Sequence, residues 1–180
     1  MNLKDMSGLE QLNAIVTGAL PPPSMGATMG LRLVRVAAGR AEFHATADPR
    51  HLNPMGGVHG GFAATVLDSV TGCAIHTVLK PGDRYGTVDL NVKMLKPIPV
   101  GVTLIATAEL IHCSNTLGVS SGILKDEAGC AYASGSATCF IRRKTSCHVV
   151  EMDETMQRRR HDATAILAGG RQRAGNTKMN

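Results

Sequence analysis

Asp68 is the most unusual residue of the stretch 53-NPMGGVHGGFAATVLDSVTG-72, in which small and aliphatic residues predominate. The pattern over residues 59–79 predicts one long helix that is apolar around most of its circumference, which is typical of an interior helix. Its polar side chains recur at steps of three or four residues and, with Gly72, form a narrow stripe: Thr65, Asp68, Ser69 and His76. Because an unpaired carboxylate is costly to bury, Asp68 either has a chemical use, lies at a partly exposed edge or caps a loop.

The start of the same predicted helix carries a second chemical signal. Gly60 and Gly61 open the helix, although glycine is a poor helix former. Glycine allows a ligand to approach the backbone closely. The first N–H groups of a helix have no intrahelical partner and lie at the positive end of its dipole. The pair therefore predicts a backbone site for an oxyanion; the alternative is close packing of the helix end against a strand.

The spacing of these two signals constrains how they can act together. Gly60 and Asp68 are eight residues apart, which is ~12 Å along a helix. One carbonyl carbon cannot contact groups at that separation. If both act on one substrate, they must come from two copies of the helix, packed antiparallel about a two-fold axis. Function at this helix thus predicts a homodimer with two shared sites.

Composition excludes several other classes of protein. A chain of 180 residues with a net charge of +5, no Trp, two Tyr and three Phe offers neither a polybasic surface nor stacking platforms, so we expect no nucleic-acid partner. No apolar run is long enough to span a membrane, and no secretory segment is visible. The five cysteines are odd in number and include no Cys-x-x-Cys, which favours reduced thiols and a cytoplasmic location. No set of residues has the spacing of metal ligands.

The remaining elements form a simple series. A short amphipathic helix over residues 3–16 ends before three prolines, and two strands, 28–38 and 41–48, form a hairpin. After the long helix and a turn at 81–86, four strands follow at 88–94, 102–112, 117–125 and 130–142. Runs of strands without βα alternation predict an α+β fold with an antiparallel sheet covering one helix. We expect a helical arm over 1–26, one main domain over 27–143, and a polar, basic and flexible tail over 144–180.

Two motifs resemble those of a known family. They are Asn53-Pro54-x-Gly56-x-Val58-His59-Gly60-Gly61, with Asp68 nine positions after His59, and the later strand 87-TVDLNVKMLKP-97. Over roughly residues 8–142 the chain resembles the hotdog-fold acyl-CoA thioesterases of the phenylacetate-degradation (PaaI-like) type, within the 4-hydroxybenzoyl-CoA thioesterase superfamily. The resemblance implies a hotdog fold, in which a curved antiparallel sheet of about six strands wraps around one long central helix. It also implies homodimers that are often paired into dimers of dimers.

The resemblance further implies hydrolysis of an acyl-CoA thioester to a free acid and CoA, with no cofactor. Asp68 would be the general base or nucleophile, and the Gly60 N–H of the other subunit would polarise the thioester carbonyl. Asn53 and His59 would orient the water or the carbonyl, and the Thr87 hydroxyl would lie near the attacking water. An activated thioester needs only a carboxylate, a positioned water and an oxyanion donor. His59 can instead cap the helix, and Asn53 before proline is also an ordinary turn residue.

Candidates for contacts with CoA are Gly61 and three cations, Lys93, Lys96 and Arg142, which are equally well explained as solvated strand ends. The acyl group is not determined by the sequence, since small aliphatic pocket residues suit an aryl ring or a medium chain. Two other functions compete with hydrolysis. One is a non-catalytic acyl-CoA-binding module, such as a metabolite sensor, which gains nothing from a buried carboxylate. The other is a dehydratase, whose active-site spacing differs.

Overall fold

The computed structural model of the chain describes residues 2–144. Its α-helices and β-strands are α1 (Gly8–Val16), α2 (Ser24–Met29), β1 (Leu31–Ala37), β2 (Arg40–Thr46), α3 (Gly60–His76), β3 (Arg84–Met94), β4 (Thr103–Cys113), β5 (Leu117–Lys125) and β6 (Ala131–Arg142). Short 3-10 turns occupy Leu3–Asp5 and Pro49–His51. Beyond Lys144, the predicted tail lies outside the described residues. None of the helices in the described part is long and apolar enough to cross a membrane.

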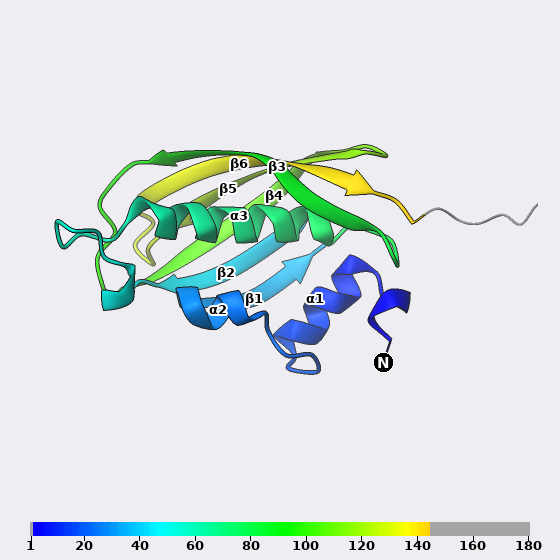
Figure 1. Ribbon diagram of the computed structural model, residues 1–180, viewed down its shortest axis with the longest axis horizontal. Helices are drawn as coiled ribbons and strands as arrows, with labels where there is room; N and C mark the ends of the chain where they lie inside the picture. Colours follow the sequence, from blue (N-terminus) through cyan, green and yellow to red (C-terminus); the bar gives the residue numbers. More distant parts are fainter. Residues whose placement is uncertain (1, 145–180) are drawn as a thin grey trace, which may run out of the picture. The chain divides into compact units, whose positions relative to one another are not determined.

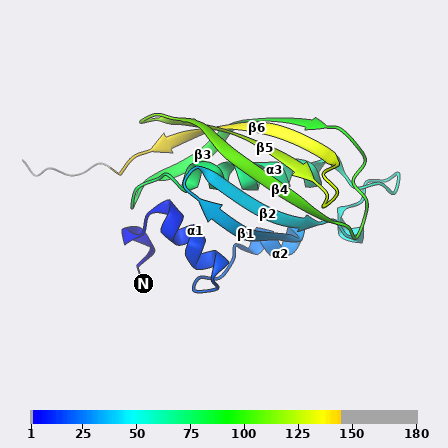
Figure 2. The same cartoon turned by 180° about the vertical axis from the view of Figure 1, so that it is seen from behind.

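The six strands form one antiparallel sheet in the order β1-β2-β4-β5-β6-β3. The sheet curves around α3, which lies against its concave face (Figure 1), and the strands cover the helix when the molecule is seen from behind (Figure 2). Helices α1 and α2 pack beside β1, at the sheet edge opposite β3. This architecture confirms the predicted α+β hotdog fold.

The core lies between α3 and the sheet. One side of α3 is fully buried, with Phe62, Val66, Leu67, Val70 and Ile75 among the least exposed side chains. The facing strands present small residues that let the helix approach: Ala41, Ala45, Ala106, Ala108, Ala133 and Ala137. Gly118 shows how close the approach is, because a Cβ there would lie 2.7 Å from Cγ2 of Ile75. Small-residue packing therefore fixes the position of α3.

Strand β3 leaves one edge of the sheet open. It pairs only with β6 among the described strands, and most of its side chains are exposed, including Val88 at 64% and Met94 at 55%. A long edge strand with exposed apolar side chains is a template for pairing with another chain. The open edge also adjoins the polar stripe of α3, since Thr87 of β3 contacts Asp68.

The helices predicted over 3–16 and 59–79 are shorter in the structure, at Gly8–Val16 and Gly60–His76. Two strand boundaries also differ from the sequence prediction. The predicted strand 28–38 begins too early, because residues 24–29 form α2 and Gly30, with φ +60°, ends that helix before β1 starts at Leu31. The predicted turn 81–86 is shorter, because β3 already starts at Arg84 and pairs with Arg142. Both errors lie where a short segment is held by its neighbours and not by its own hydrophobic period.

Candidate active site

The side chain of Asp68 is half-buried on α3 and is held by β3. Oγ1 of Thr87 donates to Oδ1 of Asp68 at 2.9 Å. A register shift between Thr87 and Asp89 interrupts the β3–β6 ladder at this point. Such irregularities often re-aim a side chain beside a functional site. Oδ2 of Asp68 has no hydrogen-bond partner within residues 2–144, so it is available to a water or a substrate.

Its neighbours in the polar stripe are already engaged. Oγ1 of Thr65 donates to the carbonyl of Gly61 at 2.9 Å, and Oγ of Ser69 donates to the carbonyl of Thr65 at 2.8 Å. Both hydroxyls thus bond back to their own helix, a common arrangement for such residues inside helices. Asp68 is therefore the charged group of this stripe that can face a ligand.

Asp68 and Thr87 line a cavity of about 280 Å³ between α3, the sheet and the N-terminal helices. The apolar part of its lining comes from α1, α2, β1, β2 and the segment joining the two helices, and includes Leu12, Ile15, Pro22, Met25, Leu33 and Phe43. A carboxylate at the wall of an apolar pocket is the arrangement expected of a ligand site. The arm predicted from residues 1–26 thus supplies much of the pocket wall.

Two further residues of this cavity were missed by the sequence analysis. Burial raises the pKa of the Tyr85 phenol and also raises the pKa of the Cys73 thiol, to about 12, so both groups stay neutral near pH 7. The ring of Tyr85 lies across Gly72, where a Cβ would be 3.3 Å from its hydroxyl. Neither residue belongs to a recognisable motif, since tertiary packing alone brings them to Asp68.

The N-terminus of α3 is arranged around His59. Nδ1 of His59 accepts a hydrogen bond from the N–H of Gly61 at 2.9 Å, and its carbonyl accepts one from the N–H of Phe62 at 2.9 Å. A Cβ on Gly61 would lie 2.8 Å from Nδ1, so a side chain there would displace the capping ring. The geometry therefore shows the capping role of His59.

The N–H of Gly60 donates to no such cap. No hydrogen-bond acceptor contacts this N–H within the described residues, as expected for the first residue of a helix. A Cβ on Gly60 would lie 3.0 Å from Cε of Met94, so the end of β3 closes over this position. The helix start therefore offers one free backbone donor beside the exposed end of β3.

Asn53 has the turn geometry that its sequence position allows. Its Oδ1 accepts hydrogen bonds from the N–H of Met55 at 2.9 Å and of Gly57 at 3.2 Å. The loop it stabilises is exposed and is closed by a bridge between Leu52 and Val58. In one chain, the amide of Asn53 orders the loop before α3 and does not contact Asp68.

The structure does not gather the candidate cations at one place. Lys93 donates to Oδ1 of Asn91 at 2.8 Å, and Lys96 donates to Sγ of Cys130 at 3.0 Å, both toward the end of β3. Arg142 lies opposite Arg84 in the ladder between β6 and β3, at the other end of β3. Ten residues of strand, about 33 Å, separate the two ends. Within one chain, these groups cannot bind one phosphate-bearing ligand.

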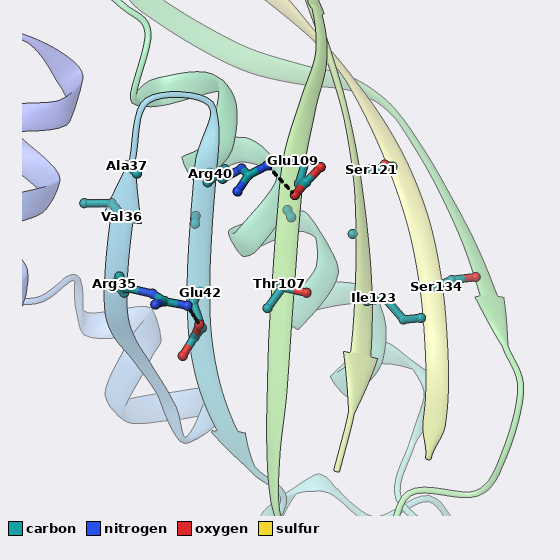
Figure 3. A pocket seen from close by; sticks show the side chains of 13 residues that line it. Arg35, Val36, Ala37, Arg40, Glu42, Thr107, Glu109, Ser121, Ile123 and Ser134 are labelled. Carbon is teal, nitrogen blue, oxygen red and sulfur yellow. Dashed lines mark hydrogen bonds and ion pairs between the residues drawn. The ribbon is translucent and has the colours of Figure 1, made fainter. Parts of the chain in front are cut away.

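A larger depression of about 660 Å³ lies on the outer face of the sheet (Figure 3). Its charged side chains bind one another: Arg35 pairs with Glu42 at 2.8 Å and Arg40 with Glu109 at 3.1 Å. None of the residues predicted for the active site lines it. We therefore do not assign the active site to this depression, although it is larger than the Asp68 cavity.

Comparisons with known proteins agree with this geometry. The family described as the Thioesterase superfamily matches residues 55–130. Acyl-coenzyme A thioesterase 13 of Homo sapiens is 28% identical over 98 residues, which cover 54% of this chain and 69% of that protein. A phenylacetic acid degradation-related protein from Ralstonia eutropha JMP134 superimposes with a TM-score of 0.66 at 30% identity, covering 72% of this chain and 98% of that one. A thioesterase family protein from Silicibacter pomeroyi gives a TM-score of 0.65 at 26% identity.

Proposed function

Because the chain belongs to the thioesterase superfamily and is a thioester hydrolase, we propose that its substrate is an acyl-CoA and that Asp68 attacks or activates water for hydrolysis. One observation carries this assignment. Asp68 is held by Thr87 at 2.9 Å, at the wall of an apolar cavity, with its second carboxylate oxygen free of protein partners in the described part of the chain. A sensor that only bound acyl-CoA would gain nothing from this group.

The chemistry can follow either of two balanced routes. As a general base, Oδ2 of Asp68 takes a proton from water, the hydroxide adds to the thioester carbonyl, and the CoA thiolate leaves and is reprotonated. As a nucleophile, Oδ2 attacks the carbonyl itself and the CoA thiolate leaves and is reprotonated, which gives a mixed anhydride that water then hydrolyses. Thr87 orients the carboxylate in both routes. Single turnover in ¹⁸O-water separates them, because only the second route can place the label in the Asp68 carboxylate.

We propose that the oxyanion is bound by the N–H of Gly60 from a second copy of the chain. Within one helix, Gly60 and Asp68 are ~12 Å apart, which is too far for one carbonyl. Antiparallel pairing of two β3 edges, which are free and carry exposed Val88 and Met94, sets two α3 helices antiparallel and brings the start of one beside the middle of the other. It also brings the Arg142 end of one chain toward the Lys93 and Lys96 end of the other, where CoA phosphates need cations. Two such dimers form the proposed tetramer.

The cavity indicates the size of the acyl group. An engineered apolar cavity of about 150 Å³ is known to bind benzene, and the cavity beside Asp68 has about 280 Å³. This is room for an acyl group of roughly ten carbons, either a medium chain or a substituted aryl ring. A panel of acyl-CoAs with free-thiol detection gives the preferred length.

The assignment of Asp68 is tested with Asp68→Asn, which keeps the shape and removes the charge. We expect turnover to fall by about 10²-fold or more, in line with the loss of a general base or nucleophile. Thiol release that persisted undiminished in this variant would disprove the catalytic role.

Shared sites are tested by subunit mixing. Asp68→Asn and a Gly60→Pro variant, which lacks the N–H, are each inactive alone on this proposal. After exchange, half of the dimers are mixed and each holds one intact site, so about a quarter of wild-type activity returns. A site contained in a single chain would give no recovery.

A further inference from the structure

A lysine–cysteine pair lies at the end of β3 that adjoins the start of α3. Nζ of Lys96 donates to Sγ of Cys130 at 3.0 Å. Lys96 follows two residues after Met94, whose Cε lies 3.0 Å from the position of a Cβ on Gly60. Two extended residues span at most about 7 Å. The pair therefore lies at the end of the sheet at which β3 passes the start of α3.

The surrounding backbone holds both members in place. The N–H groups of Leu95 and Lys96 donate to the carbonyl of Tyr132 at 2.8 Å and 3.2 Å. The N–H of Cys130 donates to one carboxylate oxygen of Asp126 at 2.8 Å, and the Tyr132 hydroxyl donates to the other at 3.1 Å. Hydrogen bonds on both sides thus support the contact between ammonium and sulfur.

Cys130 differs from the other described cysteines. Cys113 lies against the guanidinium of Arg143 at 3.7 Å, and a guanidinium does not accept acyl groups. Cys139 is fully buried, and burial raises the pKa of Cys73 to about 12. Cys130 is only half-buried, and a cation beside its sulfur is the setting in which cysteine attacks electrophiles. The hydrogen bond to Cys130, and then the electrostatic interaction with it, raise the pKa of Lys96, so the amine holds its proton until a base takes it.

We propose that Cys130 and Lys96 form a self-acylation site, at which an acyl-CoA transfers its acyl group first to Sγ of Cys130 and then to Nζ of Lys96. The inference rests on the proposed function, because it needs acyl-CoA to bind at this end of the sheet. It differs from hydrolysis in its residues, its acceptor and its product.

The steps balance without any further reactant. The Cys130 thiolate adds to the thioester carbonyl, and the CoA thiolate leaves and takes a proton from the Lys96 ammonium. The neutral amine then attacks the new thioester on Cys130, forms an amide and releases the cysteine sulfur, which takes the second proton. One acyl-CoA is consumed and one CoA thiol is produced. Holding the amine at 3.0 Å from the sulfur gives the second step the advantage of an intramolecular reaction.

The product has a functional consequence. Acylation removes the positive charge of Lys96, which is one of the cations proposed to meet the CoA phosphates. Enzyme that has met high acyl-CoA therefore binds its substrate less tightly, and KM rises while the Asp68 chemistry is unchanged.

The test uses the full-length protein incubated with octanoyl-CoA, followed by peptide mass spectrometry. We expect octanoyl amide on Lys96, and at least about tenfold less of it in Cys130→Ser, because the effective concentration of the relay is lost. Lys96→Arg should instead accumulate octanoyl on Cys130, which hydroxylamine removes. Lys93, which contacts Asn91 and no cysteine, is the internal control.

Three results would overturn the proposal: no octanoyl on either residue, equal labelling of Lys93 and Lys96, or undiminished Lys96 labelling in Cys130→Ser. The same experiment in the Asp68→Asn background keeps the acyl-CoA from being hydrolysed. Labelling of Lys96 there is expected to equal or exceed that of the wild type. Hydrolysis by Cys130→Ser is measured separately and is expected to be unchanged, so a failure of this inference is distinguishable from a failure of the proposed hydrolase mechanism.

Discussion

Gly60→Pro removes a single N–H group while leaving the helix able to form. Proline is favoured at the first position of a helix, where its missing N–H has no intrahelical partner. It requires an extended conformation of the preceding residue, and His59 already has φ −65° and ψ 137°. The change in stability should therefore be small, within about 1 kcal/mol. The substitution isolates the proposed oxyanion donor.

The expected effect on catalysis is large. Loss of one oxyanion donor lowers kcat by about 10²–10³-fold, and because the donor acts mainly in the transition state, KM should change little. The assay is release of free thiol at saturating acyl-CoA, with the melting temperature measured in parallel. Gly60→Ala is the matched control, since it retains the N–H and adds the same Cβ 3.0 Å from Cε of Met94. That methyl is the end of a flexible side chain and can move.

Two outcomes would refute the reasoning. If Gly60→Pro kept its kcat within a few-fold of the wild type while remaining folded, the N–H of Gly60 would not bind the oxyanion. If Gly60→Ala lost as much activity as Gly60→Pro, crowding against Met94 and not the missing N–H would be responsible.

Three further predictions concern Thr87, Gly61 and His76. Thr87→Val removes the hydroxyl that donates to Asp68 at 2.9 Å. Hydrogen bonds to charged groups contribute about 1.5–3 kcal/mol, and the exposed position of Thr87 favours the lower end of this range. We therefore expect kcat to fall about tenfold, whereas Thr87→Ser should stay near wild type. Gly61→Ala places a Cβ 2.8 Å from Nδ1 of His59 and should cost about 1 kcal/mol of stability, because the helix cap is lost. Chemical denaturation should show the same loss of stability in His59→Ala, and no further loss in the variant that carries both substitutions. Burial lowers the pKa of His76 below 6.5, so the unfolded state binds the proton more readily than the folded state. The free energy of unfolding should therefore fall as pH drops below about 6.5. The urea midpoint should fall less over this pH range in His76→Gln than in the wild type.

The sequence was most informative where one element contains the whole pattern. The apolar helix, its narrow polar stripe and its glycine start all lie within residues 59–79, and the structure places α3 over Gly60–His76. The period-two alternation of the later strands was equally readable. By contrast, α2 has six residues, includes Gly26 and follows three prolines, so no hydrophobic period reveals it.

Contacts between distant segments could not be read from spacing. The resemblance to a family placed the Thr87 hydroxyl near the attacking water, but its hydrogen bond to Asp68 was not expected, and neither were Tyr85 and Cys73 in the cavity. The open alternatives for His59 and Asn53 depended on side-chain rotamers. In the single chain both have local hydrogen bonds, to Gly61 and to the loop 53–57, which no pattern of residue types distinguishes from a catalytic role.

The exposed edge of β3 has a kinetic consequence. On the proposed assembly, a separated chain carries an acid from one site and an amide from another, and neither half can turn over substrate. The rate per chain should then fall on dilution and become proportional to protein concentration once most dimers have dissociated, so that the total rate follows the square of that concentration. Added inactive Asp68→Asn subunits should partly restore the rate per chain. Strand pairing would thus set the enzyme's working concentration as well as its architecture.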